Sequence, residues 1–153
     1  MNKLSKIGSC VPTMSDKDIA IAIAAEERAK ELPPLPCVTQ HTLHSGIYSR
    51  TMFMPKGSVA VGVIIQIPTT VIISGKVALY IGEEVIHIDG YNVIPALGNR
   101  KQVAYAIEDS YATLIFKTEA TTVEEAEQEM TIEYNRLLSR DSKSINITNI
   151  TGV

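Results

Sequence analysis

Cysteine is scarce in this sequence, which contains only Cys10 and Cys37 among its 153 residues. The two thiols could pair, but residues 1–14 lack the long apolar core of a secretory signal. We therefore expect both cysteines to be free thiols in a protein of the reducing cytoplasm.

Long apolar runs and a strong excess of one charge are also missing. Gln66, Pro68 and Thr69 interrupt the longest apolar stretch, so no segment reaches the about 18 residues that a membrane-spanning helix needs. The net charge of −3 argues against an extended nucleic-acid surface, although a local basic pocket for phosphate needs only a few cations. With 45% hydrophobic and 20% charged residues, the chain has the composition of one soluble globular domain.

Residues that commonly carry catalysis are few. The sequence contains no Gly-x-Ser-x-Gly motif, and both cysteines lie close to prolines rather than at a strand-to-helix turn. His41 and His44 precede a Gly-containing turn, where we expect them to be exposed or locally hydrogen-bonded. His87 alternates with Ile86 and Ile88 and should point to solvent. These patterns do not indicate an active site.

From His41 to Lys117, apolar residues recur with a period of two, and turn signals recur about every eight to twelve residues. We predict strands at 47–54, 59–66, 69–74, 76–81, 84–88, 91–95, 102–107 and 110–116, with a hairpin turn at Ser74-Gly75. Short strands at this spacing predict a mainly β fold, a double-sheet jelly-roll barrel whose mouth can hold one small ligand.

The segment before the barrel is predicted to hold one helix. After an extended arm at residues 1–14, Ser15 is placed to act as the N-cap, with Asp18 completing a variant of the capping box. The helix cannot continue past Leu32, because the Pro-rich linker at 33–36 lacks backbone donors and imposes an extended path.

A second helix is predicted after the barrel. Thr121 or Thr122 can cap it, and the spacing of its apolar residues extends it to about Ser139. The tail at 144–151 partly alternates but has no obvious partner strand in its own barrel. Such a tail is either disordered or added to the edge of a neighbouring subunit.

The stretch from Gly57 to Gly75 organises the predicted barrel, and its spacing resembles the first motif of the cupins. Further features resemble small cupin-like proteins of unknown function that bacteriophages encode. They are Tyr-Ser-Arg-Thr at 48–51, Pro-Lys-Gly at 55–57, Ile-Pro-Thr at 67–69, Ser-Gly at 74–75, Gly-Asn-Arg-Lys at 98–101 and Glu-Asp at 108–109. The resemblance implies an arm, helix and linker at 1–41, a cupin-like barrel at 42–118, and a helix and tail at 119–153.

Cupin motifs carry metal ligands, and this chain departs from the motifs at those positions. The histidine positions of the first motif fall on Val63 and Ile65, and its glutamate position falls on Pro68. The histidine position of the second motif falls on Lys101 or, in a shifted alignment, on Ile107. Because a metal centre needs several imidazole or carboxylate ligands, we expect no metal, no other cofactor and none of the usual cupin chemistry.

What remains is a basic loop, which in cupins lies at the barrel mouth. There the Arg100 guanidinium and the Lys101 ammonium would suit an anionic ligand. The candidate ligand-binding residues, if their faces point inward, are Arg100, Lys101, Arg50, Tyr48, Tyr105, Gln66, Thr69 and Thr70. The alternative is a surface turn whose charge Glu108 and Asp109 balance.

These observations lead to three hypotheses of different classes. The first is a phage-encoded, metal-free protein of the host cytoplasm that binds a small anionic or nucleotide-like ligand without turnover and sequesters a host signalling nucleotide. The second is a structural or assembly protein of the virion, whose terminal arms contact neighbouring copies. The third, a divergent cupin enzyme, would require a bound metal. Under the first two we expect a homo-oligomer, because both terminal segments could pair with a neighbour.

Overall fold

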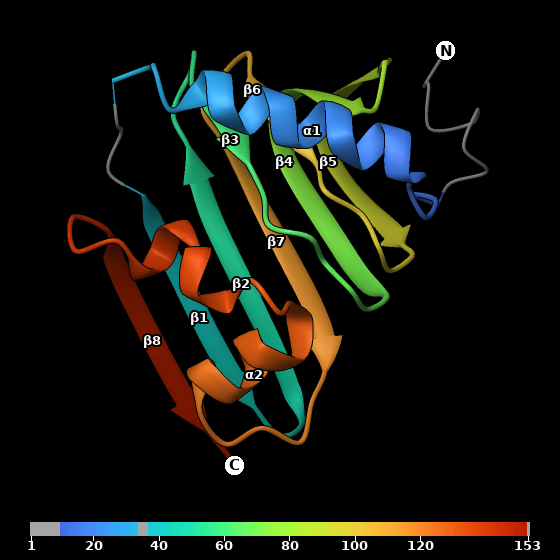
Figure 1. Ribbon diagram of the computed structural model, residues 1–153. Helices are drawn as coiled ribbons and strands as arrows, with labels where there is room; N and C mark the ends of the chain where they lie inside the picture. The colour runs from blue at the N-terminus through green and yellow to red at the C-terminus, as the bar shows by residue number, and fades with distance from the viewer. Residues whose placement is uncertain (1–9, 34–36, 153) are drawn as a thin grey trace.

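The computed structural model describes residues 10–33 and 37–152, and Figure 1 shows their arrangement. Eight strands form a sheet in the order β3-β6-β4-β7-β2-β1-β8, with β5 paired to β4 off this path. The strands are β1 (Val38–His44), β2 (Ile47–Met54), β3 (Val59–Val61), β4 (Thr69–Ile81), β5 (Glu84–Ala96), β6 (Val103–Ala106), β7 (Ser110–Lys117) and β8 (Ile145–Thr151). The helical segments are α1 (Asp16–Ala29), α2 (Val123–Met130) and the 3-10 turns η2 (Tyr134–Arg136) and η3 (Leu138–Arg140). The prediction of a mainly β fold with a helix on each side of the barrel sequence is confirmed.

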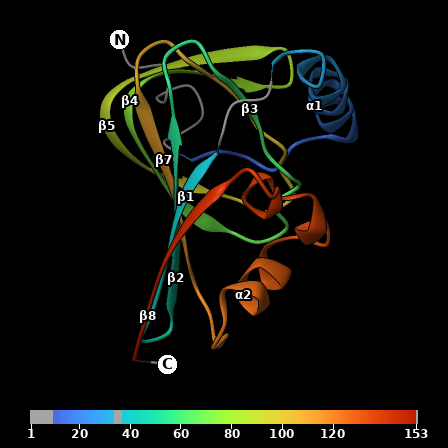
Figure 2. The same cartoon turned by 90° about the vertical axis from the view of Figure 1, so that its left-hand side faces the viewer.

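The sheet is curled, and both helices lie on its concave side, as Figure 2 shows. We call this the inner side and the opposite side the outer side. Two apolar clusters fill the inner side, one beneath each helix. The upper cluster, against which Ile19 of α1 packs, contains Val11, Met14, Met54, Ile73, Val77, Leu79, Ile81, Ile86, Ile88, Ile94, Ala96 and Ala106. The lower cluster includes α2 and contains Leu43, Tyr48, Val63, Phe116, Ala120, Ala126, Met130 and Leu137.

The first helix begins where the sequence predicts. The Ser15 hydroxyl accepts a hydrogen bond of 3.1 Å from the backbone N–H of Asp18, and Asp16 and Asp18 place negative charge in the first turn. The helix ends at Ala29, within the limit at Leu32 that the sequence predicts. The helix therefore stops one turn before the prolines.

The strands β4 and β5 are each one long strand where the sequence predicts two short ones. They pair along their whole length, with Gly75 opposite Gly90 in the middle, so the predicted hairpin at Ser74-Gly75 is wrong. Gly75 and Gly90 have φ values of 135° and 80°, which let the paired strands bend instead of ending. Beyond this bend the other edge of β4 changes its partner from β7 to β6.

The stretch from Gly57 to Gly75 is only partly core, with Ser58, Val63, Thr69 and Ile73 buried, and less of it is strand than predicted. The predicted strand 59–66 shrinks to β3, and the chain after it is irregular except for an isolated bridge between Ile65 and Arg100. Val63 is buried, and Ile65 and Ile67 pack against the lower cluster.

The second helix begins as predicted and ends early. The Thr122 hydroxyl accepts a hydrogen bond of 3.2 Å from the backbone N–H of Glu125. The helix ends at Met130 instead of about Ser139, because Thr131 is extended and the chain continues through η2 and η3. This break lets both Met130 and Leu137 reach the lower cluster.

The tail is the edge strand of its own sheet. β8 pairs in parallel with β1 over the full length of both strands, so the prediction that it lacks a partner strand is wrong. The sequence prediction missed the partner, because β1 directly follows the Pro-rich segment and was not assigned as a strand.

Part of the predicted arm and linker, residues 1–9 and 34–36, lies outside the described residues. At the end of the arm, Val11 bridges to Ala96 and Met14 is buried. Within the described ranges, no helix has the length and apolar character that crossing a membrane would require.

Candidate functional site

The eight predicted ligand-binding residues do not gather in one place. Arg100 and Thr69 lie together at a hollow in the wall of the sheet, whereas Arg50 and Tyr48 belong to a polar network beside α2. Lys101 is engaged elsewhere, with α1. The candidate site must therefore be built from these groups separately.

Arg100 is a buried cation whose hydrogen-bond partners are all neutral. Its side chain is 1% exposed, and its Nη2 donates to Thr69 Oγ1 at 2.6 Å. Its Nη1 donates to the carbonyl oxygens of Leu97 at 2.7 Å and Ile67 at 3.3 Å. Within the described chain, its Nε finds no hydrogen-bond partner. Burial lowers the pKa of Arg100 to about 10, which expresses the cost of holding this charge without a carboxylate nearby.

A hollow of about 370 Å³ has two of these hydrogen-bond partners, Thr69 and Leu97, in its wall. Its lining residues are Cys10, Pro68, Thr69, Thr70, Pro95, Ala96, Leu97, Ile115, Phe116 and Lys117. Lys117 brings an ammonium group, and none of these lining residues brings a carboxylate. With the Arg100 guanidinium behind the wall, the hollow carries positive charge that none of its described lining residues neutralises. We call it the Arg100 hollow.

Lys101 is occupied by the protein itself. Its side chain is 2% exposed, and its Nζ lies 2.7 Å from a Glu26 carboxylate oxygen and donates to the Gly62 carbonyl at 2.8 Å. The ammonium group therefore fastens α1 to the irregular stretch after β3. Glu26 is its counter-charge, instead of Glu108 or Asp109.

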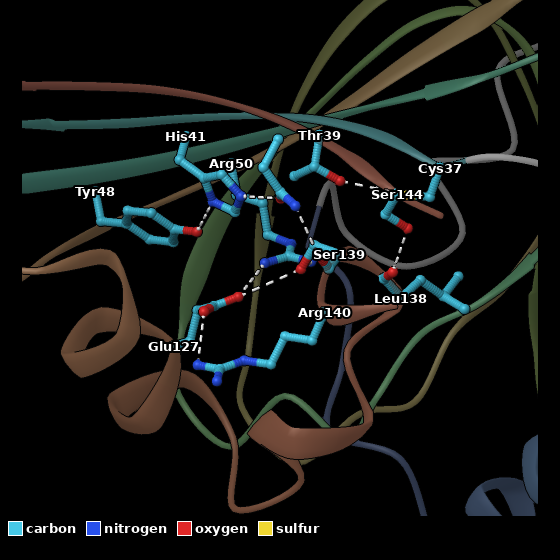
Figure 3. A network of polar contacts seen from close by, with 11 residues as sticks. Cys37, Thr39, His41, Tyr48, Arg50, Glu127, Leu138, Ser139, Arg140 and Ser144 are labelled. Atoms are coloured by element: carbon cyan, nitrogen blue, oxygen red, sulfur yellow. Dashed lines mark hydrogen bonds and ion pairs between the residues drawn. The ribbon is translucent and has the colours of Figure 1, made fainter. Parts of the chain in front are cut away.

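Figure 3 shows the second polar group, which lies between the inner side of the sheet and the C-terminal segment. The buried Glu127 carboxylate accepts hydrogen bonds from Arg50 Nη1 at 2.8 Å and from Arg140 Nη2 at 2.9 Å. Arg50 also donates to Ser139 Oγ at 2.8 Å. The Arg50 guanidinium thus holds α2 and η3 against β2.

A hydrogen-bonded relay continues this network to β8. His41 Nδ1 lies 2.7 Å from the Tyr48 hydroxyl oxygen, and His41 Nε2 lies 2.7 Å from Asn146 Oδ1. Because Asn146 Nδ2 donates to the Ser139 carbonyl at 2.7 Å, Asn146 Oδ1 is the acceptor for His41 Nε2–H. His41 Nδ1 then accepts from the Tyr48 hydroxyl. We call this the His41 relay.

Burial sets the charge state of the His41 relay. It lowers the pKa of His41 against the opposing effect of the Asn146 hydrogen bond, and it raises the pKa of Tyr48 to about 12. Both side chains are therefore neutral around neutral pH. The prediction that His41 is locally hydrogen-bonded is confirmed, although the ring is buried; His44 and His87 are exposed as expected.

The other candidates have simpler positions. The side chains of Tyr105 on β6 and Gln66 after β3 are exposed, and Thr70 is half-buried in the wall of the Arg100 hollow. Sequence reasoning did not single out Lys117, which reaches the hollow because β7 pairs with β4. It also missed Glu127 and Asn146. In the sequence, Glu127 has the pattern of an exposed helix face, and Asn146 lies in a tail with no evident partner strand.

Neither cysteine is in a disulfide, as predicted. Across residues 10–33 and 37–152, no three His, Cys, Asp or Glu side chains come together in a way that could hold a metal ion.

No protein-family model and no curated protein matches this chain. Similar solved structures include a cupin-superfamily protein from Desulfitobacterium hafniense, at 9% identity and a TM-score of 0.45, which covers 60% of this chain and 87% of that one. A protein from Klebsiella pneumoniae with a double-stranded β-helix domain has 14% identity and a TM-score of 0.46, over 60% of this chain and 82% of that one. An RmlC-like cupin from Methanocaldococcus jannaschii has 14% identity and a TM-score of 0.43, over 57% and 84%. These proteins are similar to this chain in fold.

Proposed function

We propose that this protein binds a small anionic ligand in the Arg100 hollow and does not turn it over. The observation that carries the proposal is Arg100, a buried guanidinium that, among the described residues, has one unpaired N–H and only neutral partners, behind a hollow whose described lining holds no carboxylate. A bound anion would supply the missing negative charge. The hollow's volume of about 370 Å³ lies within the range of about 300–1,000 Å³ that is typical of ligand pockets.

Each polar group at the hollow has a distinct role in this proposal. The ammonium group of Lys117 contacts the anion, and the hydroxyls of Thr69 and Thr70 donate to it. Thr69 Oγ1 already accepts from Arg100 Nη2, so its own proton is directed away from the guanidinium. Arg100 acts through Thr69 and through its field, because its side chain is almost fully buried.

The finer form of the proposal concerns the ligand's source. A phosphorylated, nucleotide-like ligand has the charge that this site suits, and sequestering a host signalling nucleotide is a role for a phage-encoded protein that holds such a ligand without changing it. Phosphate groups are the shared chemistry of these ligands, so the first test uses inorganic phosphate and a nucleotide panel together.

Isothermal titration calorimetry of the full chain tests this proposal with inorganic phosphate, pyrophosphate and a set of nucleotides. Lys117→Gln removes a charge-assisted contact, which is worth about 1.5–3 kcal/mol, and should weaken binding by about tenfold or more. Lys143→Gln, which removes an exposed lysine on the turn before β8, is the matched control and should leave the affinity unchanged. Silence from every anion, or equal weakening by both substitutions, would contradict the proposal.

A further inference from the structure

The outer side of the sheet presents a wide surface that no described element covers, since α1 and α2 both lie on the inner side (Figure 2). Strand register places on one face every second residue of β8, β1, β2, β7, β4 and β5. We call the rows from Ile145 to Tyr91 and from Ile147 to Val93 the outer face. Its residues are Ile145, Val38, Phe53, Tyr111, Ser74 and Tyr91 in the first row, and Ile147, Gln40, Thr51, Thr113, Ile72 and Val93 in the second.

The two rows of the outer face are uncharged and mostly apolar, with Ser74, Gln40, Thr51 and Thr113 as their polar residues. Tyr91, Val93, Tyr111, Ile145 and Ile147 have exposed fractions between 52% and 69%, which is unusual for large apolar side chains grouped on one surface. None of its residues is charged, although charged residues make up 20% of the whole sequence. Depletion of charge with enrichment in tyrosine and aliphatic residues is the composition of a protein interface core.

The same face carries both a protruding ring and a hollow. Tyr91 is the most exposed of its large apolar residues, at 69%. A hollow of about 290 Å³ lies on neighbouring strands and is lined by Val38, Gln40, Thr51, Phe53, Tyr111 and Ile147. A cavity of about 150 Å³ is enough to hold benzene, so this hollow has room for a tyrosine ring. The Tyr91 ring and this hollow lie about 10–14 Å apart, which is the spacing of two to three strands.

We propose that the outer face is the interface of a two-fold symmetric homodimer, in which Tyr91 of each copy inserts into the hollow of the other. A two-fold interface requires that one surface complement itself. The outer face meets this requirement because it holds both the protruding Tyr91 ring and a hollow that can receive it. Because the face carries no charge, stacking two copies places no like charges opposite each other. The two sheets would pack face to face about 10 Å apart, as in a β-sandwich.

The size of the surface also fits a second copy of this chain as the partner. Packing over all seven residues of β8 would extend two rows beyond the outer face, and six strands about 4.8 Å apart would then give a flat footprint of about 550 Å². Side-chain relief raises the accessible area above this flat value, toward the about 800 Å² that each partner buries in a standard interface. The next two rows along the strands hold Thr70, Pro95, Ile115 and Lys117 of the Arg100 hollow, so a dimer that buries this whole footprint would also cover that hollow.

Sedimentation velocity and light scattering across a dilution series test the proposal on the full chain. We expect a species of twice the 16.7 kDa chain mass that Tyr91→Lys and Tyr111→Lys each convert to monomer, since a lysine would be desolvated at the interface. Tyr105→Lys replaces an exposed tyrosine on β6, outside the outer face, and should remain dimeric. Circular dichroism and thermal unfolding confirm that each variant is folded.

Three outcomes would overturn the proposal. The first is a monomeric wild type at all concentrations. The second is a dimer that persists in both Tyr91→Lys and Tyr111→Lys. The third is a monomeric wild type that dimerises only after residues 1–9 are deleted, since the chain's own N-terminal segment would then be the occupant of the outer face.

Discussion

His41 is the residue whose ionisation the fold constrains most directly, because both of its ring nitrogens are engaged in hydrogen bonds. Protonation would place a second donor on Nδ1, opposite the Tyr48 hydroxyl, inside a buried site where the Glu127 carboxylate only partly offsets the Arg50 and Arg140 charges. The neutral imidazole is the form that the folded protein stabilises. Burial, more than the identity of its neighbours, decides this preference.

A loss of stability at mildly acidic pH follows from the lowered pKa of His41. Above the ordinary value of 6.5 the ring is neutral in both the folded and the unfolded chain. Below it the unfolded chain binds a proton first, so stability falls as pH drops through the folded pKa, by up to about 1.4 kcal/mol per pH unit. Urea unfolding at about pH 7.5 and about pH 5.5 measures the difference.

The control for this prediction is a second histidine on the same strand. His41→Gln should shrink the difference in unfolding free energy between the two pH values, whereas His44→Gln, which changes an exposed ring, should preserve it. A pH dependence that both variants retain in full would show that other groups cause it.

At the scale of single elements, β4 shows how one backbone position shapes the sheet. Its 13 residues pair with β5 throughout, while its other edge pairs first with β7 and then with β6. Gly75 lies at this change of partner, with a φ value of 135°. A Cβ there would clash with the Ser110 hydroxyl and approach Ser110 Cβ to 2.7 Å and Ser110 Cα to 2.8 Å. The element therefore requires glycine for both conformation and space.

Gly75→Ala should lower the free energy of unfolding by about 2–5 kcal/mol, because backbone strain and overpacking add. Gly90→Ala is the matched comparison: its φ is also positive, at 80°, but nothing lies within 4 Å of the added Cβ. Its cost should be about 1–2 kcal/mol, from backbone strain alone. Urea denaturation of both variants gives the two values, and equal losses would show that the contact with Ser110 is unimportant.

At the scale of the whole molecule, the fold closes by joining distant parts of the chain. β8 pairs with β1, and Asn146 contacts His41 across 105 positions of sequence. Glu127 provides a second long-range contact, since its carboxylate forms ion pairs with both Arg50 of β2 and Arg140 after α2. The lower half of the protein therefore depends on contacts between residues that lie far apart in the sequence.

Asn146→Ala should lower the free energy of unfolding by about 1–3 kcal/mol, because it leaves the buried His41 Nε2–H and the Ser139 carbonyl without their partner. Asn149 lies on the same strand, but register turns its side chain to the outer side, so Asn149→Ala should change stability by no more than about 0.5 kcal/mol. Chemical denaturation of the two variants measures the contrast. Similar losses would show that the strand, and not the His41 relay, carries the stabilisation.

Much of the local structure follows from the sequence alone. Ser15 and Thr122 cap their helices as predicted, since their hydroxyls meet backbone N–H groups of the next turn. The strand at 47–54 has the predicted bounds, because period-two alternation and a flanking turn determine it locally. The apolar character of the Gly57–Gly75 stretch predicts its core residues in part, since Val63 and Ile73 are buried whereas Val59 is exposed.

The tertiary structure decided everything that depends on burial or on pairing between distant segments. Gly75 and Gly90 read as turns in sequence, and only their pairing across two long strands makes them a bend. Arg100, Lys101 and Arg50 read alike as basic residues, yet the fold gives a carboxylate partner to two of them and leaves Arg100 with neutral partners only. Short-range patterns determine capping and alternation, whereas the electrostatic environment of a side chain depends on which distant residues the fold brings around it.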